Sequence, residues 1–242
     1  MLKKIFRQKP QRSMEYCSAV IVAAGNATRM QGEDKIFSQI GDKTVICHTL
    51  DAFMESQYVD EIILVTRADV LGHLSSLCKA KGYDKVTSIV EGGATRAESV
   101  MRGLDYVSEK AGLAAIHDGA RPLITVDIIN DTIGKAQKFY AAAPAIPVKD
   151  TIKQAENHFV SGTPDRSMLF AVQTPQVFDY DLLRGALKKA IDEGVPITDD
   201  CSAVEAIGMR VYLSEGSEEN IKITTPLDLA LAEAILHRRL QK

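Results

Sequence analysis

The sequence predicts an α/β fold built on a mostly parallel β-sheet, because short apolar runs alternate along the chain with segments of helical spacing. The first of these runs is β-branched, which is typical of a strand buried on both faces by flanking helices. One polar stretch, residues 150–176, lacks helical periodicity and interrupts the alternation. We expect it to form a β-arm over about residues 150–172 that projects from the sheet.

Each predicted strand delivers a loop to the carboxyl edge of the sheet. The first, residues 17–23, is followed by a small-residue loop, and further strands are expected at residues 61–65, 85–90, 114–117 and 143–148. Helical spacing at residues 45–54 and 98–107 predicts connecting helices. Thr225 followed by Pro226 marks the start of an amphipathic helix over residues 227–240. Because ligands collect outside the carboxyl ends of strands in such sheets, functional residues are expected in these loops.

The length of the chain favours a single domain. Its 242 residues are enough for one α/β domain, which we expect to span residues 15–242. Residues 1–14 are basic but have no apolar stretch after the basic region, so they do not have the pattern of a secretory signal. We expect a disordered basic tail there. The alternative is that translation begins at Met14.

The composition argues against several classes of partner. A net charge of -3 and a pI near 6.0 do not suit general nucleic-acid binding, which needs clustered cations. The longest uncharged stretch of the most apolar region, between Glu15 and Arg29, is shorter than the roughly 20 residues of a membrane helix. The four cysteines lie far apart without a Cys-x-x-Cys pair, so neither a zinc site nor a disulfide framework is predicted. A reducing cytoplasm fits best.

The loop after the first strand has the composition of a triphosphate-binding site. Ala23, Ala24 and Gly25 have small side chains that let backbone amides approach phosphate oxygens. Arg29 and Lys35 follow and supply positive charge. No Gly-x-Gly triplet and no Gly-Lys-Ser/Thr sequence occurs in the chain, so neither a dinucleotide site nor a P-loop is predicted. A tight turn with surface cations is the alternative.

Six further stretches place small, polar or charged residues at or near predicted strand ends. They are residues 91–100, 117–122, 147–153, 173–176, 198–200 and 220–226. With the loop after the first strand, and in this order, they resemble the motif set of the 2-C-methyl-D-erythritol 4-phosphate cytidylyltransferase family. The resemblance runs from about residue 18 to the last helix. It implies a Rossmann-like, three-layer nucleotidyltransferase fold.

The resemblance implies that CMP is transferred from CTP to 2-C-methyl-D-erythritol 4-phosphate, giving 4-diphosphocytidyl-2-C-methyl-D-erythritol and pyrophosphate in non-mevalonate isoprenoid synthesis. Such chemistry asks for alignment and charge stabilisation rather than a general base, because the nucleophile is an anionic phosphate. The residues implied to be catalytic are Arg29, Lys35, Arg166 and Lys222. Those implied to bind substrate are Ala23, Ala24, Gly25, Gly93, Arg96, Ser99, Asp118, Arg121, Thr151 and Thr174. A magnesium ion would be bound mainly through the CTP phosphates, without dedicated protein ligands.

The resemblance further implies a homodimer formed through the arm, with Arg166 and Thr151 reaching the active site of the neighbouring subunit. Two alternatives remain open. A ribitol-5-phosphate cytidylyltransferase shares most of these motifs, and an inactive nucleotide-binding protein would keep the fold without the activity. The cations expected at both substrate phosphates favour an active enzyme.

Several of these residues also have structural interpretations. Asp199 and Asp200 are expected to cap a helix that starts near Cys201. Lys222 lies in a short apolar run, where a charge needs a partner or a cleft. Arg96 begins a predicted helix, where a cation faces the unfavourable end of the helix dipole, so a nearby anion such as a phosphate would explain it.

Overall fold

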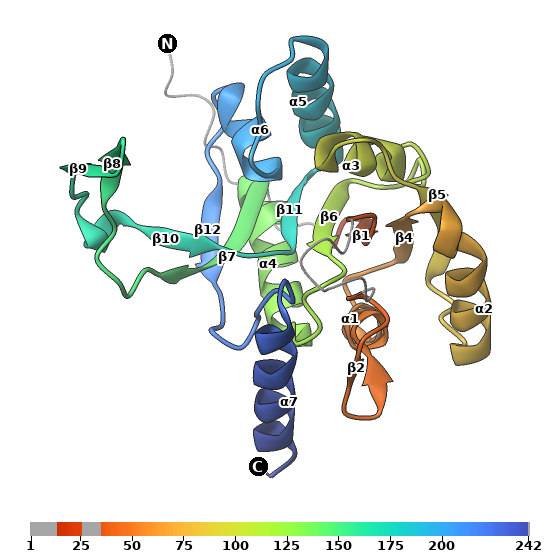
Figure 1. Cartoon of the computed structure of the whole chain (residues 1–242). Helices are drawn as coiled ribbons and strands as arrows, with labels where there is room; N and C mark the ends of the chain where they lie inside the picture. Colours follow the sequence, from red (N-terminus) through yellow and green to blue (C-terminus); the bar gives the residue numbers. More distant parts are fainter. Residues whose placement is uncertain (1–13, 26–34, 242) are drawn as a thin grey trace.

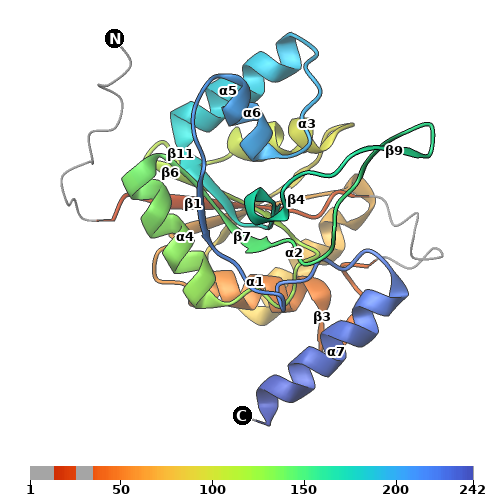
Figure 2. The same ribbon diagram turned by 90° about the vertical axis from the view of Figure 1, so that its left-hand side faces the viewer.

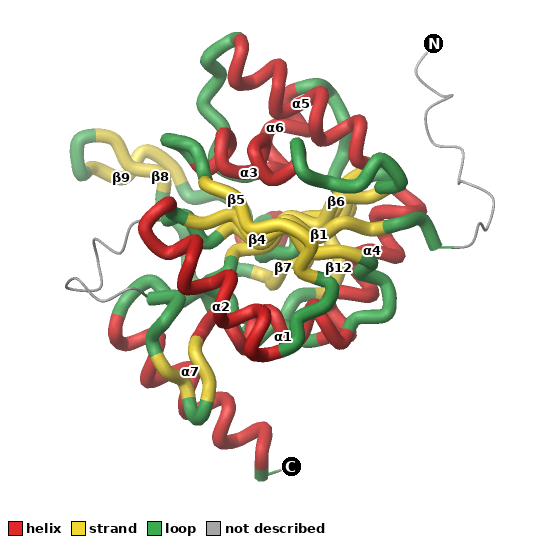
Figure 3. Tube along the Cα trace, turned by 90° about the vertical axis from the view of Figure 1, so that its right-hand side faces the viewer, coloured by secondary structure: helices red, strands yellow, loops and turns green. Residues whose placement is uncertain are grey.

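The computed structural model describes residues 14–25 and 35–241. Its centre is an eight-stranded sheet, seen edge-on with its flanking helices in Figure 3. Hydrogen-bonded neighbours follow the order β10 (Phe170–Val172), β7 (Ala141–Pro147), β11 (Gln176–Asp179), β6 (Leu113–Asp118), β1 (Cys17–Val22), β4 (Glu61–Thr66) and β5 (Val86–Glu91), and β12 (Tyr212–Glu215) also pairs with β7.

The sheet is mostly parallel, as the sequence predicts. β6, β1, β4 and β5 run parallel to one another, and β12 runs parallel to β7. β11 is antiparallel to both of its neighbours, and β10 is antiparallel to β7. The sequence did not predict β11 or β12, whereas the strands it did predict lie within two residues of their expected bounds.

Helices cover both faces of the sheet and make three layers (Figures 1 and 3). One face carries α1 (Val45–Glu55), α2 (Leu71–Lys81) and α4 (Val126–Phe139), with α7 (Pro226–Leu240) below them. The other face carries α3 (Arg96–Leu104), α5 (Tyr180–Asp192) and α6 (Asp200–Ala206). No helix of the described ranges is both long and apolar enough to cross a membrane.

Each face of the sheet has its own apolar core. Leu50 and Phe53 of α1 and Ile129 of α4 are fully buried against one face. Leu104 of α3 and Leu183 of α5 are fully buried against the other. Burying a side chain of this size stabilises the fold by roughly 1.5 to 3 kcal/mol. The central strands are apolar on both sides because both faces are covered.

Polar side chains fix where several helices begin. The Thr95 hydroxyl accepts a hydrogen bond from the Glu98 amide at the start of α3. Thr225 and Asp228 form a capping box at the start of α7, with Pro226 in its first turn. Asp199 and Ser202 form a capping box at the start of α6, which confirms the expected cap for Asp199.

The polar stretch after β7 leaves the body of the molecule. Its hairpin, β8 (Gln154–Glu156) and β9 (Phe159–Gly162), projects to one side in Figure 1 and is seen from another direction in Figure 2. The chain then makes a short 3-10 turn, Arg166–Met168, and returns to the main sheet as β10. A second small hairpin, β2 (Gln39–Ile40) and β3 (Lys43–Thr44), precedes α1.

Candidate active site

A cavity of about 450 Å³ lies at the carboxyl ends of β1, β4, β5 and β6. Its wall is built from the residues after β1, the turn after β4, the loop between β5 and α3, and the end of β6. Lys222 reaches it from the segment between β12 and α7. Ligands of open α/β sheets bind outside the carboxyl ends of the strands, and the cavity lies at that edge.

The cavity brings together most of the predicted site residues in the described part of the chain. Those that line it are Ala23, Ala24, Gly25, Lys35, Gly93, Arg96, Ser99, Asp118 and Lys222. Those that do not line it are Arg121, Thr151, Arg166 and Thr174. Arg29 lies outside the described residues. Arg67 and Glu91 also line the cavity, and the sequence predicts no site role for either, although Glu91 begins the stretch 91–100.

The loop between β5 and α3 is shaped by close packing. A Cβ on Gly92 would lie 2.6 Å from the Cβ of Ala24, so the two loops approach closely only because this residue is glycine. The Ser99 hydroxyl accepts a hydrogen bond from the Gly93 amide at 3.0 Å and donates one to the Thr95 carbonyl at 2.9 Å. Ser99 therefore holds the loop from inside the first turn of α3.

Asp118, at the end of β6, is the centre of a charge cluster. Its Oδ2 lies 2.7 Å from Lys222 Nζ and 3.8 Å from Arg121 Nε, and its Oδ1 lies 3.7 Å from Arg96 Nε. Burial alone would raise the pKa of this carboxyl, but Lys222 and Arg96 outweigh it and hold the pKa at about 2. Asp118 is therefore ionised, and it gives Lys222 the partner that its apolar surroundings require.

Arg96 is held by a second carboxylate, that of Asp200. Arg96 Nη2 lies 2.7 Å from Asp200 Oδ2, and the Asp200 side chain is fully buried. The expectation that Asp200 only caps a helix is wrong, because its carboxylate turns inward to Arg96 while Asp199 makes the cap. The anions beside Arg96 are thus protein carboxylates. They offset the cost of burying the guanidinium and keep it charged.

Thr174 and Arg121 lie behind the cavity wall. The buried Thr174 hydroxyl accepts a hydrogen bond from the Asp118 amide at 3.1 Å and lies 3.0 Å from Nδ1 of His117. Arg121 Nη1 donates a hydrogen bond of 2.6 Å to the carbonyl oxygen of Asn220. Both side chains support cavity residues from behind within this chain.

Thr151 and Arg166 lie in the segment that carries the arm. Both side chains are exposed, and Arg166 Nη1 donates a hydrogen bond of 2.6 Å to the carbonyl oxygen of Lys149. This contact ties the end of the hairpin to its base. Neither residue contributes to the cavity of its own chain.

The cavity wall offers few ligands for a metal ion. No group of three or more His, Cys, Asp or Glu side chains in the described ranges is placed to hold one. Of the two carboxylates on the wall, Asp118 already faces three cations. This donor set fits a divalent ion that is held mainly by substrate phosphates.

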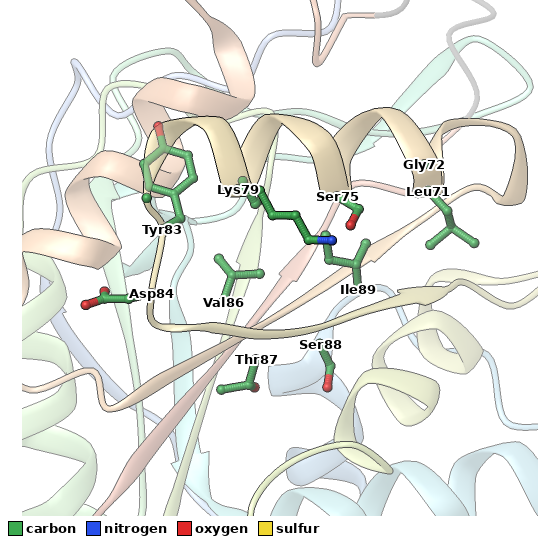
Figure 4. A pocket seen from close by; sticks show the side chains of 12 residues that line it. Leu71, Gly72, Ser75, Lys79, Tyr83, Asp84, Val86, Thr87, Ser88 and Ile89 are labelled. Atoms are coloured by element: carbon green, nitrogen blue, oxygen red, sulfur yellow. The ribbon is translucent and has the colours of Figure 1, made fainter.

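A larger hollow, of about 700 Å³, lies between α2 and β5 (Figure 4). Its lining includes Ser75, Lys79, Thr87 and Ser88. None of the predicted site residues in the described ranges lines it. The predicted cations and the glycine loop instead meet in the smaller cavity.

The sequence and the fold of this chain are similar to those of a known family of enzymes. The sequence model of the 2-C-methyl-D-erythritol 4-phosphate cytidylyltransferase family matches residues 17–238. The chain belongs to this family. The resemblance predicted from the motifs is confirmed, and the family is one of nucleotidyltransferases.

Individual relatives agree with the family match. A 2-C-methyl-D-erythritol 4-phosphate cytidylyltransferase of Clostridium novyi is 47% identical over 221 residues, which cover 90% of this family member and 95% of the relative. One of Caldanaerobacter subterraneus is 46% identical, covering 91% and 99%. The crystal structure of 4-diphosphocytidyl-2C-methyl-D-erythritol synthase from Anaerococcus prevotii superposes with a TM-score of 0.83 at 30% identity, covering 92% and 96%.

Sequence reasoning missed the roles of two buried residues in this family member. The sequence predicts a helix cap for Asp200, and it predicts no individual role for Asn220, which begins the stretch 220–226. The contact partners of both lie far away in the sequence, 104 residues for the Asp200 pair with Arg96 and 99 residues for Asn220 with Arg121. For Asp200 the local sequence offers one indication: two adjacent aspartates stand at the start of the helix, and the cap needs only one of them.

Proposed function

We propose that this family member transfers CMP from CTP to 2-C-methyl-D-erythritol 4-phosphate and releases pyrophosphate. The observation that carries the proposal is that Lys35, Lys222 and the Gly93 loop line one cavity at the carboxyl ends of the strands. Relatives at 42–47% identity bear the name of this activity, which favours methylerythritol phosphate over ribitol phosphate.

The geometry suggests how CTP would lie. The cytosine and ribose would occupy the side of the cavity formed by Gly93 and Ser99, where the loop is held rigidly by the Ser99 hydroxyl. The triphosphate would lie along Ala24 and Gly25, near Lys35, whose Nζ is 4.0 Å from the position of a Cβ on Gly25. Small residues and a cation on one side of the cavity suit an extended polyanion.

Lys222 also lines the cavity, beside Asp118, and is suited to the sugar phosphate. Its ion pair with Asp118 fixes the ammonium group without removing it from the cavity. An oxygen of the sugar phosphate would attack the α-phosphorus of CTP as the bond to the pyrophosphate oxygen breaks, and the bonding electrons would leave with pyrophosphate. Lys35 and Lys222 would stabilise the charge that builds up on the reacting phosphates.

A magnesium ion would be held by triphosphate oxygens and water, because Asp118 is engaged with cations of the protein. When bound, such an ion neutralises charge on the phosphates and favours departure of pyrophosphate. The protein would then contribute alignment and the fixed cations Lys35 and Lys222.

We also propose that the chain forms a homodimer through its arm. The arm and the neighbouring sheet edge expose large apolar side chains, namely Phe159, Val160, Met168, Phe170 and Val172. Such a patch on a hairpin with little core of its own suits a partner surface. In the dimer, Arg166 and Thr151 would reach the cavity of the partner, which agrees with their absence from the cavity of their own chain.

A cytoplasmic location belongs to the same proposal. Cys17, Cys47, Cys78 and Cys201 are all buried and free of disulfides. Unpaired buried cysteines are typical of proteins kept in a reducing compartment.

The test is pyrophosphate release from the purified protein with magnesium and CTP, offered methylerythritol phosphate or ribitol phosphate. We expect release with CTP and methylerythritol phosphate, and little with ATP, GTP or UTP. Preference for ribitol phosphate would reassign the substrate while keeping the mechanism. If no combination of nucleotide and sugar phosphate released pyrophosphate, the proposed activity would be rejected.

A further inference from the structure

The segment that carries Lys222 has no regular secondary structure. It runs from the end of β12 at Glu215 to the start of α7 at Pro226. Its backbone is held at two points, where the Gly216 amide donates a hydrogen bond of 3.0 Å to the Ala145 carbonyl and the Ile223 amide donates one of 2.8 Å to the Ala120 carbonyl. Yet Lys222 must keep its ammonium in the cavity and beside Asp118. Between these two points, side chains of other elements hold the residues that precede Lys222.

Two buried amides supply the first set of contacts. Asn220 is fully buried, and its Nδ2 donates hydrogen bonds to Gln173 Oε1 at 3.2 Å and to the Thr174 carbonyl at 3.0 Å. Gln173 Nε2 in turn donates to the Ser217 carbonyl at 2.7 Å. The geometry demands a donor at position 220, because both partners of its side chain are acceptors.

Space around this amide pair is also restricted. A Cβ on Gly216 would lie 2.8 Å from Gln173 Oε1 and 3.0 Å from the backbone of Ala145. A glycine there lets the segment approach close enough for Gln173 to reach Ser217. Gln173 follows directly after β10, so these hydrogen bonds connect the sheet edge to the Lys222 segment.

Arg121 supplies the second set of contacts. Its Nη1 donates a hydrogen bond of 2.6 Å to the Asn220 carbonyl, and its Nε lies 3.8 Å from Asp118 Oδ2. One guanidinium thus faces both the backbone two residues before Lys222 and the carboxylate that pairs with Lys222. A lysine could not reach both with the same fork geometry.

We propose that Asn220, Gln173 and Arg121 are positioning residues that fix Lys222 against Asp118 for the reaction. None of the three lines the cavity, so they act through Lys222 rather than on the substrate. For Arg121, which the family resemblance implies to bind substrate, the hydrogen bond to Asn220 supports a positioning role. The inference rests on the proposed function, because its readout is cytidylyl transfer.

The test is a kinetic double-mutant cycle. Asn220→Asp keeps the shape of the side chain but removes the donor, and should lower kcat by about tenfold to a hundredfold with a smaller change in KM for CTP. In a Lys222→Ala background the same change should alter kcat by less than about twofold, because the residue through which it acts is absent. Arg121→Lys should behave in the same way.

Ser56→Ala is the matched control. It removes a partly buried hydrogen bond of 2.6 Å to Asn130, just after the carboxyl end of α1, and should leave kcat unchanged. Thermal unfolding of each variant separates loss of fold from loss of positioning. Should Asn220→Asp fail to fold, Gln173→Met breaks the contact with Asn220 at similar volume and takes its place in the cycle.

Two results would overturn the inference. One is a folded Asn220→Asp or Gln173→Met protein with wild-type kcat. The other is an effect that persists undiminished in the Lys222→Ala background. An inactive wild-type protein would instead reject the proposed function, so the two failures are distinguishable.

Discussion

The loops around Asp118 and the β8–β9 arm differ in how much of their structure one chain supplies. Around Asp118, the carboxylates of Asp118 and Asp200 are buried, the cations are half-buried, and both are paired. The arm instead exposes Phe159, Val160 and Met168, and its hairpin pairs only with itself. Most of the predicted site residues in the described ranges line the cavity of one chain, whereas the arm leaves large apolar side chains exposed. Substitutions should therefore act on catalysis in the first region and on assembly in the second.

The largest effect is expected at the cavity. Lys222→Ala and Lys35→Ala should each reduce turnover by about 100- to 1000-fold, the usual scale for removing one preorganised charge. Pyrophosphate release gives the rate, and circular dichroism checks the fold. Lys188→Ala is the matched control, because Lys188 also pairs with an aspartate, at 2.9 Å, but on α5 outside the cavity. Near-normal turnover in the Lys222 or Lys35 variant would break the assigned mechanism.

The second prediction joins the two regions. Arg166→Ala and Lys35→Ala proteins should each be poorly active, but mixed subunits should regain about one quarter of wild-type activity. Half of randomly mixed dimers would be heterodimers, and one of the two sites in each would hold both residues. The mixture is assayed after subunit exchange has been demonstrated. No recovery despite exchange would place each site within one subunit.

The third prediction concerns the arm alone. Phe159→Ser should raise the dissociation constant of the dimer about fivefold or more, because an aromatic side chain at an interface commonly contributes over about 1 kcal/mol of binding. Sedimentation velocity over a concentration series measures it. Leu240→Ser is the control, because Leu240 is as exposed as Phe159, at 79%, but lies at the end of α7. Equal behaviour of the two variants would mean that the arm is not the interface.

The last prediction is a pH dependence of stability that arises in the first region. Burial lowers the pKa of His117 from 6.5 to about 3. Between these values the unfolded chain binds a proton that native His117 does not, so the free energy of unfolding should fall as the pH falls from 6.5 towards 3. His117→Gln should weaken this dependence of the free energy of unfolding on pH, as measured by chemical denaturation at a series of pH values.

His158 in the arm is the control for this pH effect. It is exposed and has a φ of 69°, a conformation that asparagine tolerates, so His158→Asn should leave the slope unchanged. A slope that responds to His158 and not to His117 would contradict the contrast between the regions.

The sequence by itself determined the parallel core of the sheet. β1, β4, β6 and β7 are largely buried on both faces, so each forms an apolar run that is visible without knowledge of its neighbours. β11 has only four residues and β12 is mostly exposed at the sheet edge. Their strand character depends on pairing with β7, which the local sequence does not record.

The sequence also determined which residue types gather at the site. Small residues and cations after strand ends indicated a polyanion site, and nine of the predicted residues line one cavity. Only the tertiary structure decided which of them face the cavity and which support it. Asp200 meets Arg96, and Arg121 meets Asn220, across about 100 residues of sequence. The direction of a buried polar side chain is set by the partner that satisfies it, and that partner is known only once the chain has folded.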